Sequence, residues 1–127
     1  MDDILATIPV ERLVHLFRTS PAMHSEGVKI LKAHFNCPGY AATAGELAQL
    51  VGYKRHQATN LHYGIFASKL AMDLGDPRVV EACSDFWILF LATYQERKAQ
   101  RLHGLFTLRK NTVLALQELG WEQAGKK

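Results

Sequence analysis

The sequence predicts one mainly α-helical domain that carries a small β-hairpin. Apolar residues recur at helical spacing over a long N-terminal part of the chain, whereas residues 86–94 are aromatic and β-branched, which is typical of a buried strand. The chain has 127 residues, 48% of them hydrophobic, which is enough for a single buried core. We therefore expect one domain over residues 1–127, with a helical part over about 9–83, a hairpin over 85–108 and a C-terminal helix over 111–120.

The helical part begins with two predicted helices. The first is expected over about residues 9–17, because Pro9 suits the first helical position, and a Ser-Pro break follows it. The second carries apolar residues over about 28–35. A further short helix over 77–83 is predicted because Asp76 and the proline after it form a good N-cap pair.

Two more helices are predicted in the middle of the chain, joined by a tight polar turn. Thr43 followed by Glu46 is a capping-box pattern, in which each side chain accepts a hydrogen bond from the other residue's free N–H. Gly52 supplies the left-handed residue that commonly ends such a helix. The second helix has a longer apolar stripe, made of Ala58, Leu61, Ile65 and Met72, with Phe66 and Leu70 beside them.

A short helix, a glycine turn and a longer helix with polar residues near its start are the order of a helix-turn-helix motif. In that motif the second helix enters a groove of duplex DNA. The same apolar spacing also fits an ordinary helical hairpin in a small core.

The predicted hairpin would add a wing to this helix pair. Residues 102–108 alternate well enough for a strand that returns after a polar turn at about 96–100. Two strands joined by a basic turn and packed against the helix pair predict a winged helix-turn-helix-like domain. The competing interpretation is one long helix from residue 77 to about residue 100, because Phe86 and Leu89 also fit a helical face.

Charge is segregated along the chain, whose formal net charge is +3. Residues 47–72 contain no acid, and neither do residues 97–117. The first segment holds Lys54, Arg55 and Lys69 with His56 and His62, and the second holds Arg97, Lys98, Arg101, Arg109 and Lys110. Clustered Lys and Arg neutralise phosphates and supply most non-specific affinity for DNA, so this segregation favours nucleic-acid binding.

Candidate DNA contacts follow from the geometry of a reading helix, whose first turns reach base edges. The candidates are Lys54, Arg55, His56, Gln57, Thr59, Asn60, His62 and Tyr63 in the helix pair, with Lys98 and Arg101 in the wing. Arg55 suits the O6 and N7 atoms of guanine, and Gln57 or Asn60 suits the N6 and N7 atoms of adenine. Tyr63 either stacks or contacts the DNA backbone, or fills the core beside Gly64, whose missing side chain would let another element approach. The alternative for Asn60 is a hydrogen bond to the backbone of a neighbouring loop. The two wing cations are expected to contact phosphates.

Several further motifs occur between Ile30 and Trp121. They are an aliphatic-Ala-His-aromatic segment, a Pro-Gly loop, a Thr-capped helix that ends in Val-Gly-Tyr, and an Asn-Leu-x-Tyr-Gly helix start. The residues are Ala33, His34, Phe35, Pro38, Gly39, Thr43, Leu47, Ala48, Val51, Gly52, Tyr53, Asn60, Leu61, Tyr63 and Gly64. With the tail FTLRKNTVLALQELGW, they resemble a small helical domain of bacteria and phages that occurs alone or fused to an HNH nuclease of the modification-dependent restriction type.

This resemblance implies a protein that handles DNA, in defence, counter-defence or regulation. Nuclease activity is not implied, because the chain has no adjacent His-Asn-His segment and no cysteine pairs to support one. No other catalytic motif is present: the six histidines form neither HExxH nor a pair on one helical face, and His34 is expected to be structural. Asp73, Asp76 and Glu81 are expected to be helix caps and dipole partners. We therefore expect a non-enzyme without cofactor or metal.

The remaining features indicate where the chain works. No apolar run approaches the roughly 18–20 residues that cross a bilayer, and the acidic start does not fit a secretion signal. Cys37 and Cys83 have no nearby partner in sequence and are expected to be reduced thiols, so a cytoplasmic protein is predicted.

The expected partner is duplex DNA, unmodified or modified, and a membrane is not expected. The alternatives are a phage-type inhibitor that binds a bacterial defence protein, and a specificity partner of a separately encoded nuclease. A homodimer is also expected, because side chains alternate along a strand and a strand over residues 86–94 would leave one apolar set uncovered.

Overall fold

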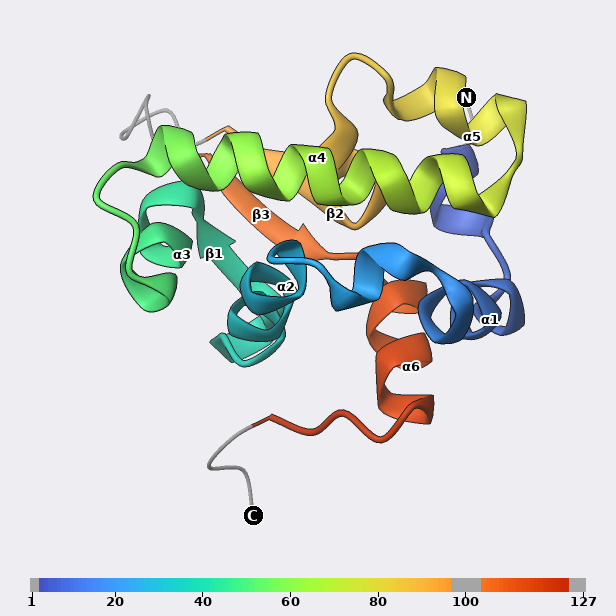
Figure 1. Cartoon of the computed structure of the whole chain (residues 1–127), viewed down its shortest axis with the longest axis horizontal. Helices are drawn as coiled ribbons and strands as arrows, with labels where there is room; N and C mark the ends of the chain where they lie inside the picture. The colour runs from blue at the N-terminus through green and yellow to red at the C-terminus, as the bar shows by residue number, and fades with distance from the viewer. Residues whose placement is uncertain (1–2, 97–103, 124–127) are drawn as a thin grey trace.

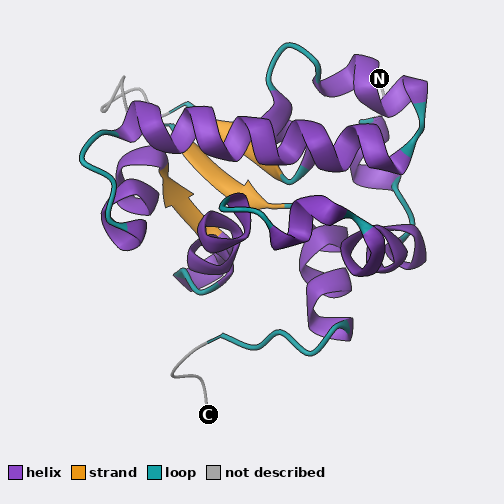
Figure 2. Cartoon of the chain, in the orientation of Figure 1, coloured by secondary structure: helices purple, strands orange, loops and turns teal. Residues whose placement is uncertain are grey.

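The computed structural model describes residues 3–96 and 104–123, which form a mainly helical body around a small three-stranded antiparallel sheet (Figure 2). The α-helices are α1 (Val10–Thr19), α2 (Gly27–Phe35), α3 (Ala44–Val51), α4 (His56–Leu74), α5 (Pro77–Cys83) and α6 (Lys110–Glu118). The short 3-10 helices are η1 (Ile4–Thr7), η2 (Pro21–His24), η3 (Pro38–Tyr40) and η4 (Trp87–Phe90). The strands are β1 (Ala41–Thr43), β2 (Ala92–Gln95) and β3 (Leu105–Leu108). None of the described helices combines the length and apolarity that crossing a membrane requires.

Strand β3 lies between β1 and β2 and is antiparallel to both. The register sets Thr43 opposite Leu105, and Tyr94 opposite Phe106. Thr43 is also the N-cap of α3. The sheet therefore holds the start of α3 beside the start of β3.

The local signals for α3 are confirmed. The hydroxyl of Thr43 accepts a hydrogen bond from the Glu46 N–H at 3.1 Å, and the Glu46 carboxylate accepts one from the Thr43 N–H at 2.8 Å. Gly52, with φ of 86°, ends the helix in the left-handed conformation. The helices expected over 28–35 and 77–83 are also present, and α1 begins just after Pro9, which serves as its N-cap.

Helix α4 runs along one side of the molecule and contacts α2, α3 and η4 (Figure 1). Its buried residues are Thr59, Tyr63, Phe66, Ala67, Leu70 and Ala71. The expected apolar stripe is therefore wrong for Leu61, Ile65 and Met72, which are 59%, 45% and 57% exposed. The spacing of apolar residues did not identify the buried face, because α4 carries apolar residues on two faces. The face that is buried also includes Thr59 and Tyr63, whose hydroxyls make it the more polar of the two in sequence.

Helices α2 and α4 pack closely where Gly27 meets Phe66. A Cβ atom placed on Gly27 would lie 2.3 Å from the Phe66 Cβ atom, far inside normal contact distance. The absence of a side chain at Gly27 is thus what allows the two helices this approach.

The expected strand over residues 86–94 is wrong in its first half. Residues 87–90 form η4, and only β2 is extended. The helical turn lets Ile88, Phe90 and Leu91 all enter the core, whereas a strand would turn alternate side chains outward. The homodimer was expected because a strand over residues 86–94 would leave one set of apolar side chains uncovered. Those side chains are instead largely buried within the domain. The alternative of one long helix to residue 100 is also wrong, because α5 ends at Cys83.

The C-terminal segment forms as expected, with α6 ending before Gly120, whose φ is 97°. Trp121 then folds back, and its ring meets that of Phe35 at a centroid distance of 5.5 Å. Arg109, just before α6, departs from the expected basic surface. It is 8% exposed, and its guanidinium donates to the Leu89 carbonyl at 2.7 Å and to the Asp3 carboxylate at 2.7 Å. Arg109 therefore links the N-terminal segment at Asp3 to η4 and to the start of α6.

Candidate nucleic-acid interface

The turn between α3 and α4 is held by backbone bonds and leaves its cations free to face solvent. The Tyr53 N–H donates to the Ala48 carbonyl at 2.8 Å across the Gly52 cap. Arg55 is the N-cap of α4, has extended backbone angles, and makes no side-chain capping bond. The first N–H groups of α4 therefore receive no side-chain cap, and they add positive potential at this end of the helix.

The structure separates the predicted contact residues into two groups. Those exposed are Lys54, Arg55, Gln57, Asn60 and His62, and His56 is half-buried. Thr59 and Tyr63 are buried, at 1% and 0% exposure, so the alternative that Tyr63 fills the core is confirmed. Lys98 and Arg101 lie outside the described residues.

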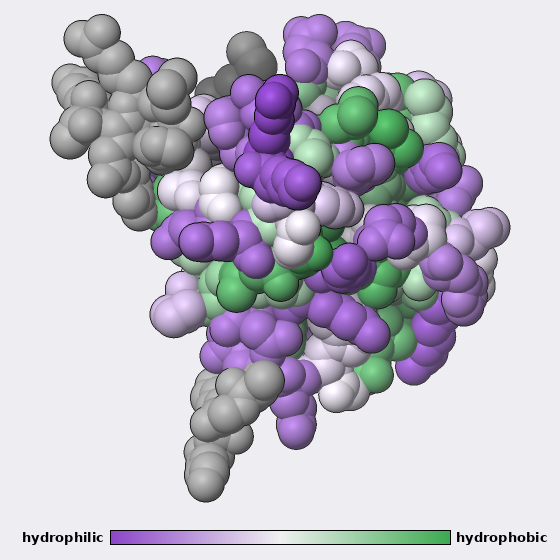
Figure 3. All heavy atoms as spheres, turned by 60° about the vertical axis from the view of Figure 1, so that its left-hand side comes forward, coloured by the Kyte–Doolittle hydropathy of each residue, from purple (hydrophilic) through white to green (hydrophobic). Residues whose placement is uncertain are grey.

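One line of residues along the surface of α4 is formed by Gln57, Asn60, Leu61, Gly64 and Ile65, which are spaced by three or four residues and so share a face. Gly64 is half-buried and the other four are exposed. We call these five residues the outer stripe. Its first turns are polar and its later turns apolar. From the side on which α3 and the start of α4 lie, hydrophilic side chains surround smaller apolar areas (Figure 3).

Gly64 does not have the role expected from the sequence. Among the described residues, no atom of another element lies within 4 Å of where its Cβ would be. A glycine inside a helix costs about 1 kcal/mol relative to alanine, and packing within the domain does not explain it here. Sequence reasoning treated Leu61 and Gly64 as interior residues, and only the rotation of α4 reveals them as surface.

Tyr63 positions α4 through a buried hydrogen-bonded chain. Its hydroxyl lies 2.8 Å from Nδ1 of His34 on α2, and Nε2 of His34 lies 3.0 Å from the Phe106 carbonyl oxygen on β3. A carbonyl only accepts, so Nε2 carries the proton, and Nδ1 accepts from the tyrosine hydroxyl. His34 is fully buried, as the expected structural histidine requires.

Burial keeps this histidine neutral. It lowers the pKa of His34 to about 4, although the Phe106 carbonyl opposes the shift. Burial likewise raises the pKa of Tyr63 well above its usual value. At neutral pH His34 is therefore uncharged and Tyr63 keeps its hydroxyl proton. The hydrogen bonds between them and to Phe106 fix α4 relative to α2 and β3.

The rings of Tyr53 and His62 are in contact at the edge of the outer stripe. Their rings lie 5.4 Å apart, and the ammonium of Lys29 lies 6.0 Å from the Tyr53 ring. The Tyr53 hydroxyl is buried and has no hydrogen-bond partner among the described residues, as is also true of the Thr59 hydroxyl.

Charge changes sign along α4. Its first end carries Lys54 and Arg55, whereas its last turn carries Asp73 and is followed by Asp76. The Asp73 carboxylate accepts a hydrogen bond from the Ser20 hydroxyl at 2.5 Å. Side-chain and backbone hydrogen bonds from Arg78 lower the pKa of Asp76. Asp76 is paired with Arg78 at 3.2 Å and with Arg12 at 3.8 Å. The start of α4, where Lys54 and Arg55 lie in an acid-free segment, is therefore the end that attracts an anionic partner.

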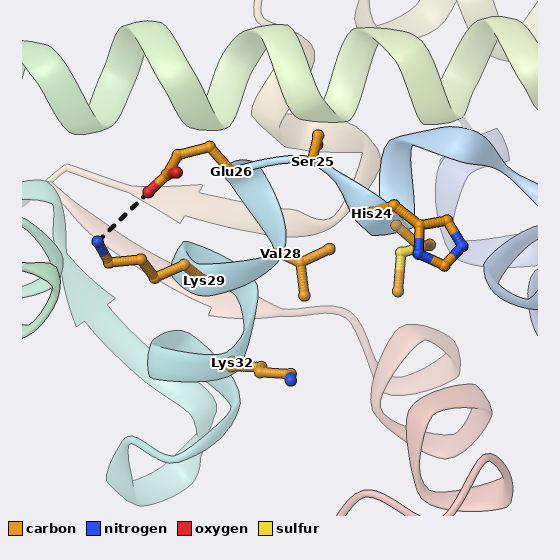
Figure 4. Close-up of a pocket in the computed structure, with 7 residues that line it drawn as sticks. His24, Ser25, Glu26, Val28, Lys29 and Lys32 are labelled. Carbon is orange, nitrogen blue, oxygen red and sulfur yellow. Dashed lines mark hydrogen bonds and ion pairs between the residues drawn. The ribbon is translucent and has the colours of Figure 1, made fainter.

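Other surfaces offer less chemistry. Figure 4 shows a hollow lined by side chains of η2, of α2 and of the two residues between them, namely Met23, His24, Ser25, Glu26, Val28, Lys29 and Lys32. Glu26 and Lys29 pair there at 3.3 Å, and every charged side chain of the hollow is exposed, so no buried polar group is available to fix a ligand. Within residues 3–96 and 104–123, no three His, Cys, Asp or Glu side chains gather as metal ligands would. The two cysteines, both described, are buried and free.

No protein-family model, curated protein or solved structure matches this chain. The resemblance to the domain of HNH nucleases therefore stays a prediction.

Proposed function

We propose that this chain is a non-catalytic DNA-binding module that places the start of α4 in the major groove of duplex DNA. The observation that carries the proposal is the joint exposure of Lys54, Arg55, Gln57 and Asn60 at one end of a long surface helix. These residue types donate to phosphates and to purine edges. No acid lies between residues 47 and 72 to repel the phosphates.

The order of the elements supports the same proposal. From α2 to β3 the chain has a helix, a strand, two helices and two further strands, and the first strand pairs with the last. We propose that this part of the chain corresponds to a winged helix. Here α5 and η4 are inserted between α4 and β2. The connection between β2 and β3 would be the wing, and Lys98 and Arg101 in it are proposed phosphate contacts.

Four of the exposed residues receive a role in this proposal. Arg55 pairs with the O6 and N7 atoms of a guanine, and Lys54 neutralises a phosphate. Gln57 and Asn60, one turn apart, hydrogen-bond to adenine. Thr59 and Tyr63 act from inside the domain by holding the helix in place. In a bacterium or phage, such a module would serve regulation or restriction, and a nuclease gene beside it would favour a specificity partner.

Competition binding tests the proposal with a matched pair of variants. Selection from random duplexes first supplies a preferred sequence and its scrambled control. Arg55→Ala is expected to weaken binding to the preferred duplex by about 1–3 kcal/mol and to change binding to the scrambled one little. Arg18→Ala, which removes an exposed arginine of α1, is expected to leave both affinities unchanged. Equal losses for Arg55→Ala on both duplexes would make it a phosphate contact.

A second candidate function is protein binding, as in an inhibitor of a defence protein. It is favoured by large apolar side chains that α3 and α4 expose, among them Leu50 at 61% and Met72 at 57%. Failure to bind any duplex at low salt would favour this candidate over the DNA-binding module.

A further inference from the structure

The outer stripe of α4 combines amide and aliphatic side chains in a way that base chemistry can use. Gln57 and Asn60 present amides that match the N6 and N7 atoms of adenine. Leu61, 59% exposed, and Ile65, 45% exposed, follow on the same face. In the major groove an A·T pair presents the adenine edge together with the C5-methyl group of thymine, which is the main apolar group of that groove.

Gly64 lies between the two aliphatic residues of the stripe. Because no other described element occupies the space beside it, the missing side chain serves nothing within this part of the domain. A glycine lets the backbone of a helix approach a ligand closely. The position therefore indicates that something other than the described residues comes against α4 at this point.

Charge identifies what that partner is. The stripe lies in the acid-free segment 47–72, with Lys54 and Arg55 before it and Lys69 after it. A polyanion is attracted to a face flanked by cations at both ends, whereas the face of a second copy of the chain would carry the same cations.

We propose that the outer stripe selects A·T-rich duplexes, with Gln57 and Asn60 on adenine, Leu61 and Ile65 against thymine methyl groups, and Gly64 allowing the helix to enter deeply. This inference rests on the proposed DNA-binding function and names the base pairs that it reads. Replacing thymine by uracil removes the methyl group and keeps the Watson–Crick pairing, so that comparison tests the proposed methyl contacts directly.

The test uses the full chain and three pools of short duplexes with random sequence: A·T pairs, A·T pairs with deoxyuridine in place of thymidine, and G·C pairs. The A·T pool is expected to bind tightest, and uracil is expected to weaken binding roughly fourfold for each methyl group contacted. Leu61→Ala, which leaves the Ile65 contact in place, is expected to reduce the thymine-to-uracil affinity ratio roughly fourfold. Leu114→Ala, which truncates a 41% exposed leucine of α6, is expected to keep the wild-type ratio.

Gly64→Ala gives an independent readout. The variant is expected to melt at a higher temperature than the wild type without DNA, because alanine favours the helix and meets no described neighbour. It is expected to bind the A·T pool more weakly than the wild type does. If Gly64→Ala bound the A·T pool as tightly as the wild type, the proposed close approach of α4 to the DNA would be overturned.

The outcomes separate this inference from the function on which it rests. If the wild type binds all three pools equally, the selectivity is overturned while DNA binding stands. If it binds none, the proposed function itself falls. Sedimentation is the last comparison. If the wild type is a dimer that Leu61→Ala dissociates, and the wild type binds the thymine and uracil pools with equal affinity, the outer stripe contacts a second copy of the chain and the inference is overturned.

Discussion

The hydroxyl of Tyr63 donates a hydrogen bond to Nδ1 of His34 across 2.8 Å, and this bond joins helix α4 to helix α2 inside the core. His34 continues the connection to β3 through the Phe106 carbonyl at 3.0 Å. The Tyr63 hydroxyl and both ring nitrogens of His34 thus have hydrogen-bond partners in the buried interior. The proposed reading helix is held by a directional contact as well as by apolar packing.

Tyr63→Phe is expected to lower the free energy of unfolding by about 1–3 kcal/mol. The substitution keeps the ring but leaves Nδ1 of His34 buried without a donor. Urea denaturation measures the change. Tyr40→Phe is the control, because the Tyr40 hydroxyl makes only an exposed 3.3 Å contact with Gln117 and should cost little. Equal stability of wild type and Tyr63→Phe would contradict the structural role of this bond.

Stability is expected to fall as the pH is lowered from about 6.5 to about 4. The pKa of His34 is about 4 in the folded protein against 6.5 for a free histidine, so the unfolded chain takes up a proton first. The contribution, on the order of 3 kcal/mol, is complete above pH 6.5 and is lost through this window. Denaturation at several pH values measures it, and His34→Gln should flatten the slope. A wild-type slope unchanged by His34→Gln would assign the proton to another group.

Gly27→Ala and Gly64→Ala are expected to have opposite effects on stability. At Gly27 the added methyl group would overlap Phe66, whose Cβ lies 2.3 Å away, and overpacking costs about 1–3 kcal/mol. At Gly64 the methyl group meets no described neighbour, and the gain in helix propensity is up to about 1 kcal/mol. Thermal melts of both variants give the comparison. Destabilisation by Gly64→Ala would mean that the α4 surface is packed differently.

Asp3→Asn is expected to destabilise the domain by about 1–2 kcal/mol, less than a fully buried pair would, because the Asp3 side chain is 51% exposed. The substitution leaves the Arg109 guanidinium, 8% exposed, without its carboxylate at 2.7 Å. Burial opposes ionisation of Asp3, but the hydrogen bond and charge of Arg109 outweigh it and lower the pKa of Asp3. Chemical denaturation of Asp3→Asn beside Asp85→Asn, an exposed control, measures the effect.

Local chemistry made part of the fold predictable. The capping box of Thr43 and Glu46 and the left-handed Gly52 act over a few residues, so the sequence alone identifies the ends of α3. The rotation of α4 was not predictable, because apolar residues occur on two of its faces and only packing against α2 and η4 selects between them. Arg109 was misjudged for a similar reason, since its partner Asp3 is 106 positions away in the sequence.

The candidate site was predictable in residue type but not in orientation. Lys54, Arg55 and Asn60 were expected at a DNA surface, and they are exposed. Thr59 and Tyr63 share the same segment but turn inward, because a helix sends neighbouring positions to different faces. Polarity therefore indicated the segment, and the packing of α4 decided which of its side chains are available to a partner.

The salt dependence of binding to duplex DNA tests the central claim most directly. Fluorescence anisotropy with a labelled duplex, at a series of salt concentrations, is expected to show affinity falling linearly on a log–log plot, with a slope of about 0.9 for each phosphate neutralised. Lys54→Ala is expected to reduce that slope by about 1, whereas Lys32→Ala on α2 should leave it unchanged. No detectable binding at the lowest salt, or an affinity that does not depend on salt, would contradict the account of α4 as a DNA-reading helix.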